Sequence, residues 1–272
     1  MQKADFDRLK ARFKSDKITA ERFFYRPVSF FITPIFHSLG ISGNQATLIR
    51  IPIVLLGSVL FTLGQDNFLA GYFVFLFART MDCVDGNLAV LKKNTNYIGK
   101  FLDSLVDNIY GVLLPISLSV GIWHGGQSFF GSSPALFLLI GGFCAVFNLF
   151  SELVTTHYRR LKIECNVLEG PTGNGNQKKV VNKKSILYKI FNLSKEFDAS
   201  ALLLLAFPLF LLERADVFLC LQFLFRFTVW SATLISYSGR APKELNVLRP
   251  SSRDPSWKQD PHKAAILSHL IK

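Results

Sequence analysis

Four aspartates lie in segments of the chain that are otherwise apolar. They are Asp82, Asp85, Asp103 and Asp107. Placing an ionised carboxylate inside a bilayer costs several kcal/mol of free energy, so acids in such segments indicate a functional site. The structural alternative is that they cap helices or pair with nearby lysines. Clustered carboxylates could instead bind hard divalent cations, which prefer oxygen ligands.

The spacing of these acids favours a shared site. Asp82 and Asp85 are at i and i+3, and on each expected helix the acids fall in a set of residues that shares one face. The sets are Asp82, Gly86 and Ala89, at i, i+4 and i+7, and Gly99, Asp103 and Asp107, at i, i+4 and i+8. A short loop joins the two expected helices, so the two acidic faces can meet.

Four carboxylates facing one cavity would repel one another strongly. Two divalent cations would bring four positive charges and remove that cost. Oxygen ligands suit Mg²⁺ or Mn²⁺. A two-metal site of this kind is typical of phosphoryl chemistry.

The composition indicates a membrane protein. Of the 272 residues, 50% are hydrophobic and 18% charged, whereas soluble domains average about 25% charged residues. The net charge of +12 would suit a nucleic-acid binder, but the long apolar segments exclude that class. The basic residues gather in alternate loops, as the positive-inside rule describes.

The apolar segments predict an all-α, polytopic membrane fold with six transmembrane helices, each near the roughly 20 residues that a span requires. The expected spans are 45–64, 68–91, 101–122, 135–156, 199–213 and 216–237. Ser42 or Asn44 is expected to cap the first. Before them, the aromatic segment 23–39, interrupted by two prolines, predicts an interfacial amphipathic helix.

The expected organisation has three parts: a cytoplasmic and interfacial arm (1–38), a six-helix membrane catalytic domain (39–240) and a cytoplasmic tail (241–272). The arm, the tail and the 92–100 and 159–195 loops are basic. The loops expected on the opposite side contain no lysine and a single arginine, Arg214. Both termini and the acidic site are therefore expected on the cytoplasmic side.

In chain order the acids form the pattern Asp82-x2-Asp85-Gly86-x2-Ala89-Val90-x8-Gly99-x3-Asp103-x3-Asp107. This pattern resembles the signature D-x2-D-G-x2-A-R-x8-G-x3-D-x3-D of the CDP-alcohol phosphatidyltransferases. Seven of its eight fixed positions match with every spacing intact. The motif covers about a tenth of the chain, and the expected spans extend the resemblance to roughly 40–240.

One position departs from the signature. Val90 stands where the family has arginine, which puts any contact of that arginine in doubt. Lys92, Lys93 or Arg79 are candidates to supply the charge, although none is at the motif position.

The resemblance implies a transferase that moves a phospho-alcohol unit from a CDP-linked donor to an acceptor hydroxyl and releases CMP. It implies a two-metal site for Mg²⁺ or Mn²⁺, with Asp82, Asp85 and Asp103 as ligands and Asp107 completing the site. Asp107 would also be the general base. Gly86, Ala89 and Asp82 would line the nucleotide pocket. Since family members are often homodimers, a homodimer is implied too.

Other basic residues are candidates for acceptor or phosphate contacts. They are Arg226, Arg159 and Arg79. Arg226 lies near the middle of the sixth expected span, where a guanidinium needs a partner such as an acid or an acceptor phosphate. For charged residues near cytoplasmic helix ends, including Arg50, Arg79 and Arg159, anchoring at the interface is the favoured interpretation.

The substrates stay open at this point. A CDP-diacylglycerol donor with a small polar acceptor alcohol is the first choice. The alternative is a soluble CDP-alcohol donor with a lipid or polyol-phosphate acceptor. Arg26-Pro27-x-Ser29, ahead of Gly43-Asn44-Gln45-Ala46-Thr47, resembles branches that include di-inositol-phosphate and amino-alcohol phosphotransferases.

A cation-coupled membrane carrier is the remote alternative. Intramembrane aspartates could coordinate a transported cation, but a carrier explains neither Gly86 nor Ala89 between the acids. It also predicts inverted repeats, and the sequence shows none. Expected partners are the bilayer, the CDP-linked donor and the acceptor, not nucleic acid.

Overall fold

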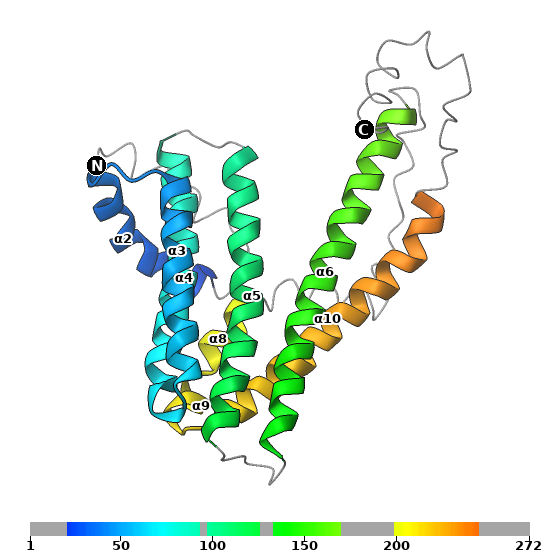
Figure 1. Ribbon diagram of the computed structural model, residues 1–272. Helices are drawn as coiled ribbons and strands as arrows, with labels where there is room; N and C mark the ends of the chain where they lie inside the picture. Colours follow the sequence, from blue (N-terminus) through cyan, green and yellow to red (C-terminus); the bar gives the residue numbers. More distant parts are fainter. Residues whose placement is uncertain (1–20, 93–96, 126–132, 170–198, 245–272) are drawn as a thin grey trace.

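The computed structural model describes residues 21–92, 97–125, 133–169 and 199–244, and all its regular elements in these ranges are helical. This confirms the all-α class. The elements are η1 (Glu21–Tyr25), α2 (Arg26–Ser38), α3 (Gly43–Thr62), η2 (Gln65–Asn67), α4 (Phe68–Leu91), α5 (Tyr97–Gly125), α6 (Pro134–Glu169), α8 (Ala199–Leu205), α9 (Phe207–Leu211) and α10 (Ala215–Glu244) (Figure 1).

Within the described residues, four helices are long and apolar enough to cross a membrane. They span Gly43–Thr62, Tyr97–Gly125, Pro134–Ile163 and Ala215–Pro242. The second expected span is a single helix, α4, but Arg79, Asp82 and Asp85 make its C-terminal half strongly charged. The fifth is two short helices, α8 and α9. The count of six spans therefore stays a prediction.

One expected boundary is wrong. The sequence predicts a loop over 159–195, but α6 continues to Glu169, so the first eleven residues of that segment are helical. Basic residues end an apolar segment without ending a helix, since lysine and arginine are good helix formers. The rest of that loop, the first twenty residues and the tail from 245 lie outside the described residues, and the three-part division stays a prediction.

Helix α2 buries a row of polar residues against the protein and exposes several of its apolar residues. Arg26, Ser29 and Thr33 are buried, whereas Phe31 and Ile35 are exposed. A helix of a soluble protein shows the reverse pattern. The expected amphipathic helix is thus present, and its outward apolar face suits contact with lipid.

Helix α3 lies at the centre of the part of the fold that carries the acids. It packs along both α4 and α5, whereas those two helices make few direct contacts with each other. The Ser42 side chain accepts a hydrogen bond from the Gln45 backbone N–H, and the Gln45 side chain accepts one from Ser42 N–H. This capping box confirms Ser42 as an expected cap and fixes where α3 begins.

The start of α3 packs closely against α4 at Gly43. A Cβ atom there would lie 2.9 Å from the carbonyl oxygen of Asp85 and 3.3 Å from the Cβ of Ala89. Glycine therefore lets the two backbones approach beside the acids.

An aromatic cluster holds the other end of the bundle. Phe61 of α3 stacks on Phe75 of α4 and on Phe210 of α9, with ring centroids 5.1 and 5.8 Å apart. Helix α6 packs on α5, and α10 packs on α6. Both lean away from α3 and α4 in Figure 1.

Replacing Gly43 by alanine should loosen the packing of α3 on α4. The new Cβ would meet a backbone oxygen that cannot turn aside, at a cost of about 1–3 kcal/mol, so the melting temperature of the purified protein in detergent should fall. Gly142→Ala in α6 is the matched control, since a Cβ there meets nothing within 4 Å. It should melt at or above the wild-type temperature. Equal melting of the two variants would contradict the described α3–α4 contact.

Candidate active site

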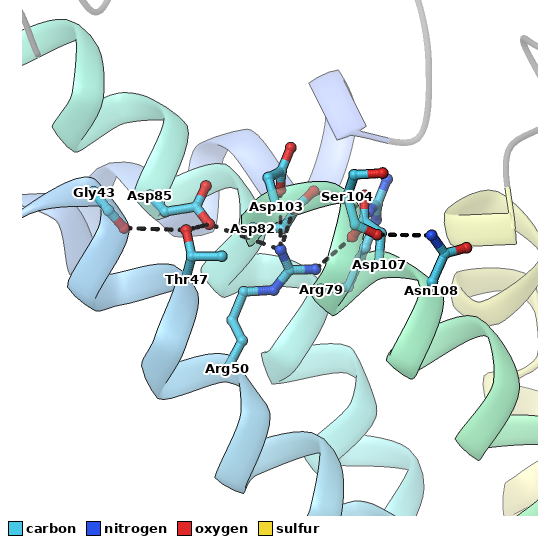
Figure 2. A network of polar contacts seen from close by, with 10 residues as sticks. All are labelled: Gly43, Thr47, Arg50, Arg79, Asp82, Asp85, Asp103, Ser104, Asp107 and Asn108. Carbon is cyan, nitrogen blue, oxygen red and sulfur yellow. Dashed lines mark hydrogen bonds and ion pairs between the residues drawn. The ribbon is translucent and has the colours of Figure 1, made fainter. Parts of the chain in front are cut away.

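The structure brings the four aspartates together near the end of the bundle where α3 begins (Figure 2). One carboxylate oxygen from each of Asp82, Asp85 and Asp103 lies within 4.8 Å of the others. The α4 side chains, Asp82 and Asp85, are 15% and 8% exposed, whereas those of Asp103 and Asp107 on α5 are 47% and 44% exposed. The site is therefore closed on the α4 side and open along α5.

The guanidinium of Arg50, from α3, lies among all four carboxylates. Its Nη1 atom is 2.5 Å from Asp82 Oδ1 and 3.3 Å from Asp103 Oδ1. The same atom lies 3.7 Å from Asp85 Oδ2, and Nη2 donates to Asp107 Oδ1 at 2.7 Å. Arg50 is fully buried. The expectation that it anchors the helix at the interface is wrong, because α3 lies between α4 and α5 and turns this side chain inward.

Two further side chains complete the polar network. Arg79 Nη1 lies 2.9 Å from Asp82 Oδ2 and 3.6 Å from Asp107 Oδ1. The Thr47 hydroxyl donates to Asp85 Oδ2 at 2.7 Å. Each carboxylate thus has a positive or hydroxyl partner, which the two enclosed carboxylates of α4 in particular require.

Thr47 and Arg50 were not predicted as residues of the site from the sequence, and Arg50 was assigned to the membrane interface. Gly43, Thr47 and Arg50 follow one another at i, i+4 and i+7, so they share the face of α3 that meets α4. Arg50 is also the single charged residue within α3. A lone charge in an apolar span is a signal of function that could have identified it.

The other predicted residues lie around or away from this cluster. Gly86 and Ala89 are half-buried on α4, and Ala89 faces Gly43 of α3. Arg226 of α10 donates to the side-chain oxygen of Asn148 on α6, and Arg159 is exposed on α6. The acceptor contacts expected of these two arginines stay predictions.

The carboxylate cluster fits a divalent metal ion. Its donors are oxygens, the set that Mg²⁺ and Mn²⁺ prefer. The Arg50 Nη1 atom shows that a cationic group fits where Asp82, Asp85 and Asp103 converge.

The family model for CDP-alcohol phosphatidyltransferase matches residues 41–237, nearly three quarters of the chain. The chain belongs to the CDP-alcohol phosphatidyltransferase family. The expectation from the motif is thereby confirmed. The protein is an integral, multi-pass membrane enzyme that transfers a phospho-alcohol from a CDP-linked donor. No curated protein matches the chain.

Replacing Arg50 by methionine should destabilise the protein when divalent cations are chelated. Removing one partner of a buried ion pair costs about 3–5 kcal/mol, because the remaining charge stays buried. Mn²⁺ should restore part of the loss, since it can replace the missing positive charge. Thermal unfolding in EDTA and in Mn²⁺ measures both effects.

Arg159→Met is the control, because Arg159 is exposed and its loss should change little. If Arg50→Met unfolded at the wild-type temperature in EDTA, Arg50 would not be holding the carboxylates.

Proposed function

We propose that this enzyme transfers a phosphatidyl group from CDP-diacylglycerol to a small polar acceptor alcohol, with release of CMP. The observation that carries the reaction class is the cluster of four carboxylates. Support for a lipid donor comes from α5, where Phe101 and Leu105 lie on the same turns as Asp103 and Asp107 but on another side of the helix, and are 66% and 42% exposed. Lipid tails could stay against these apolar side chains while the polar groups reach the acids.

The formal charges support a two-metal site. Four carboxylates and the guanidinium groups of Arg50 and Arg79 leave the cluster at −2. Two divalent cations would bring it to +2, which matches the two negative charges of a CDP-linked diphosphate. Mg²⁺ or Mn²⁺ held by Asp82, Asp85, Asp103 and Asp107 would neutralise the diphosphate and the charge on departing CMP.

The remaining chemistry belongs to the protein's own residues. The acceptor oxygen attacks the phosphorus that carries the lipid alcohol, and the bond from that phosphorus to the bridging oxygen breaks. CMP leaves with the bridging oxygen. Asp107 takes the proton of the acceptor hydroxyl, since it lies at the open side of the cluster where an acceptor can approach.

The proposal includes the placement of the enzyme. Gly86, Ala89 and Asp82 line the nucleotide pocket on α4, at the cytoplasmic end of a six-span domain whose termini are both cytoplasmic. Arg79, Arg159 and Arg226 are candidate contacts of phosphate or acceptor. As in many members of the family, the working unit is a homodimer.

A soluble CDP-alcohol donor is the second candidate. The Arg26-Pro27-x-Ser29 element favours it through its resemblance to amino-alcohol and di-inositol-phosphate branches. CMP release from purified protein with Mg²⁺ or Mn²⁺ separates the two. CDP-diacylglycerol would be compared with CDP-choline, CDP-ethanolamine and CDP-glycerol, each with a panel of acceptors. The donor that yields CMP identifies the branch, and no CMP from any pair would contradict the transferase proposal.

Asp107→Asn should retain Mn²⁺-dependent CMP binding but lose turnover by about 10²–10⁴-fold, the usual contribution of a general base. Asp82→Asn should weaken both binding and turnover, because Asp82 lies at the centre of the cluster. Calorimetry with CMP and the CMP-release assay measure the two quantities. Wild-type turnover by Asp107→Asn would show that another group takes the proton.

A further inference from the structure

A buried polar network joins α2 to the part of α4 that carries the motif. Arg26, Ser29 and Thr33, at i, i+3 and i+7 on α2, are buried and all contact Asn87 of α4. Asn87 accepts a hydrogen bond from Arg26 Nη1 at 3.2 Å. Its amide donates to the hydroxyl oxygens of Ser29 and Thr33 at 3.0 and 3.2 Å. These bonds hold Arg26 in a defined place on α4.

That place lies beside the acidic face. On α4, Asp82, Gly86 and Val90 follow one another at i, i+4 and i+8, so they form one stripe. Asn87 is the next residue after Gly86, about 100° round the helix from it. A guanidinium bound to Asn87 therefore flanks the stripe on its α2 side. Arg26 also acts electrostatically on Asp82, together with Arg50 and Arg79.

The stripe includes position 90, where the family signature has a positively charged arginine and this chain does not. An arginine at position 90 would project from the same face as Asp82 and Gly86, but the residue there is Val90. The substitutes that sequence analysis offered have other contacts. Lys92 Nζ donates to the Gly40 carbonyl at 2.6 Å, and Arg79 is paired with Asp82 and Asp107. Lys93 lies outside the described residues.

We propose that Arg26 of α2 makes a cationic contact with the CDP-linked donor, next to the position where the family signature has arginine and this chain has Val90. The charge comes from a different helix and reaches the same stripe from the side. This inference rests on the proposed nucleotide chemistry. It makes α2 part of the donor site as well as a membrane-facing helix.

The test measures CMP binding by calorimetry at saturating Mn²⁺. Arg26→Gln should weaken binding about 10- to 100-fold, the usual range for losing a charge-assisted contact. Adding Val90→Arg to Arg26→Gln should bring the affinity back to within a few-fold of wild type. Val90→Met in the same background should not, because it adds bulk without charge.

Ser29→Ala is the matched control for packing. It removes two hydrogen bonds, the one from the Asn87 amide and the one to the Arg26 backbone carbonyl. It leaves the charge of Arg26, so CMP affinity should be close to wild type. Equal losses in Ser29→Ala and Arg26→Gln, or no recovery with Val90→Arg in a folded protein, would overturn the inference. Wild-type protein that binds no CMP would contradict the proposed function instead.

Discussion

Four carboxylates in an apolar helix bundle must be matched by positive charge, and the arrangement of the central helices follows from this requirement. Arg50 lies within 3.7 Å of every one of them, and it can do so because α3 lies between α4 and α5. Gly43 permits the close approach of α3 to α4. The acidic faces of α4 and α5 are therefore joined through a third helix more than by direct contact.

The same arrangement links the fold to the chemistry. The aromatic cluster around Phe61 holds α3, α4 and α9 together at the far end, so the acid-bearing ends meet at a fixed spacing. The α4 acids are enclosed, whereas the α5 acids are nearly half-exposed. A site with one enclosed side for cations and one open side suits a reaction between a lipid-linked donor and a polar acceptor.

Much of this could be predicted from residue spacing. The aspartate stripes, the all-α class, the Ser42 cap and the family all follow from local patterns, and the structure or the family match confirms them. Arg50 could have been marked as functional by its lone charge in an apolar span. Its place among the acids could not be predicted, because an arginine two turns inside a helix end is as compatible with snorkelling as with burial. The length of α6 was missed because charge marks a membrane boundary, not a helix end. The pairing of Arg26 with Asn87 joins residues 61 positions apart, and no local pattern reports such a contact.

The most direct test of the account is anomalous X-ray diffraction from crystals grown with Mn²⁺ and CMP. The account predicts manganese peaks between Asp82, Asp85 and Asp103, with Arg50 displaced from the point where their carboxylates converge. Crystals with bound CMP, no manganese at these carboxylates and Arg50 still bridging them would contradict it. In that case the aspartates would be a structural ion-pair cluster, and the reaction would have to be carried by other residues.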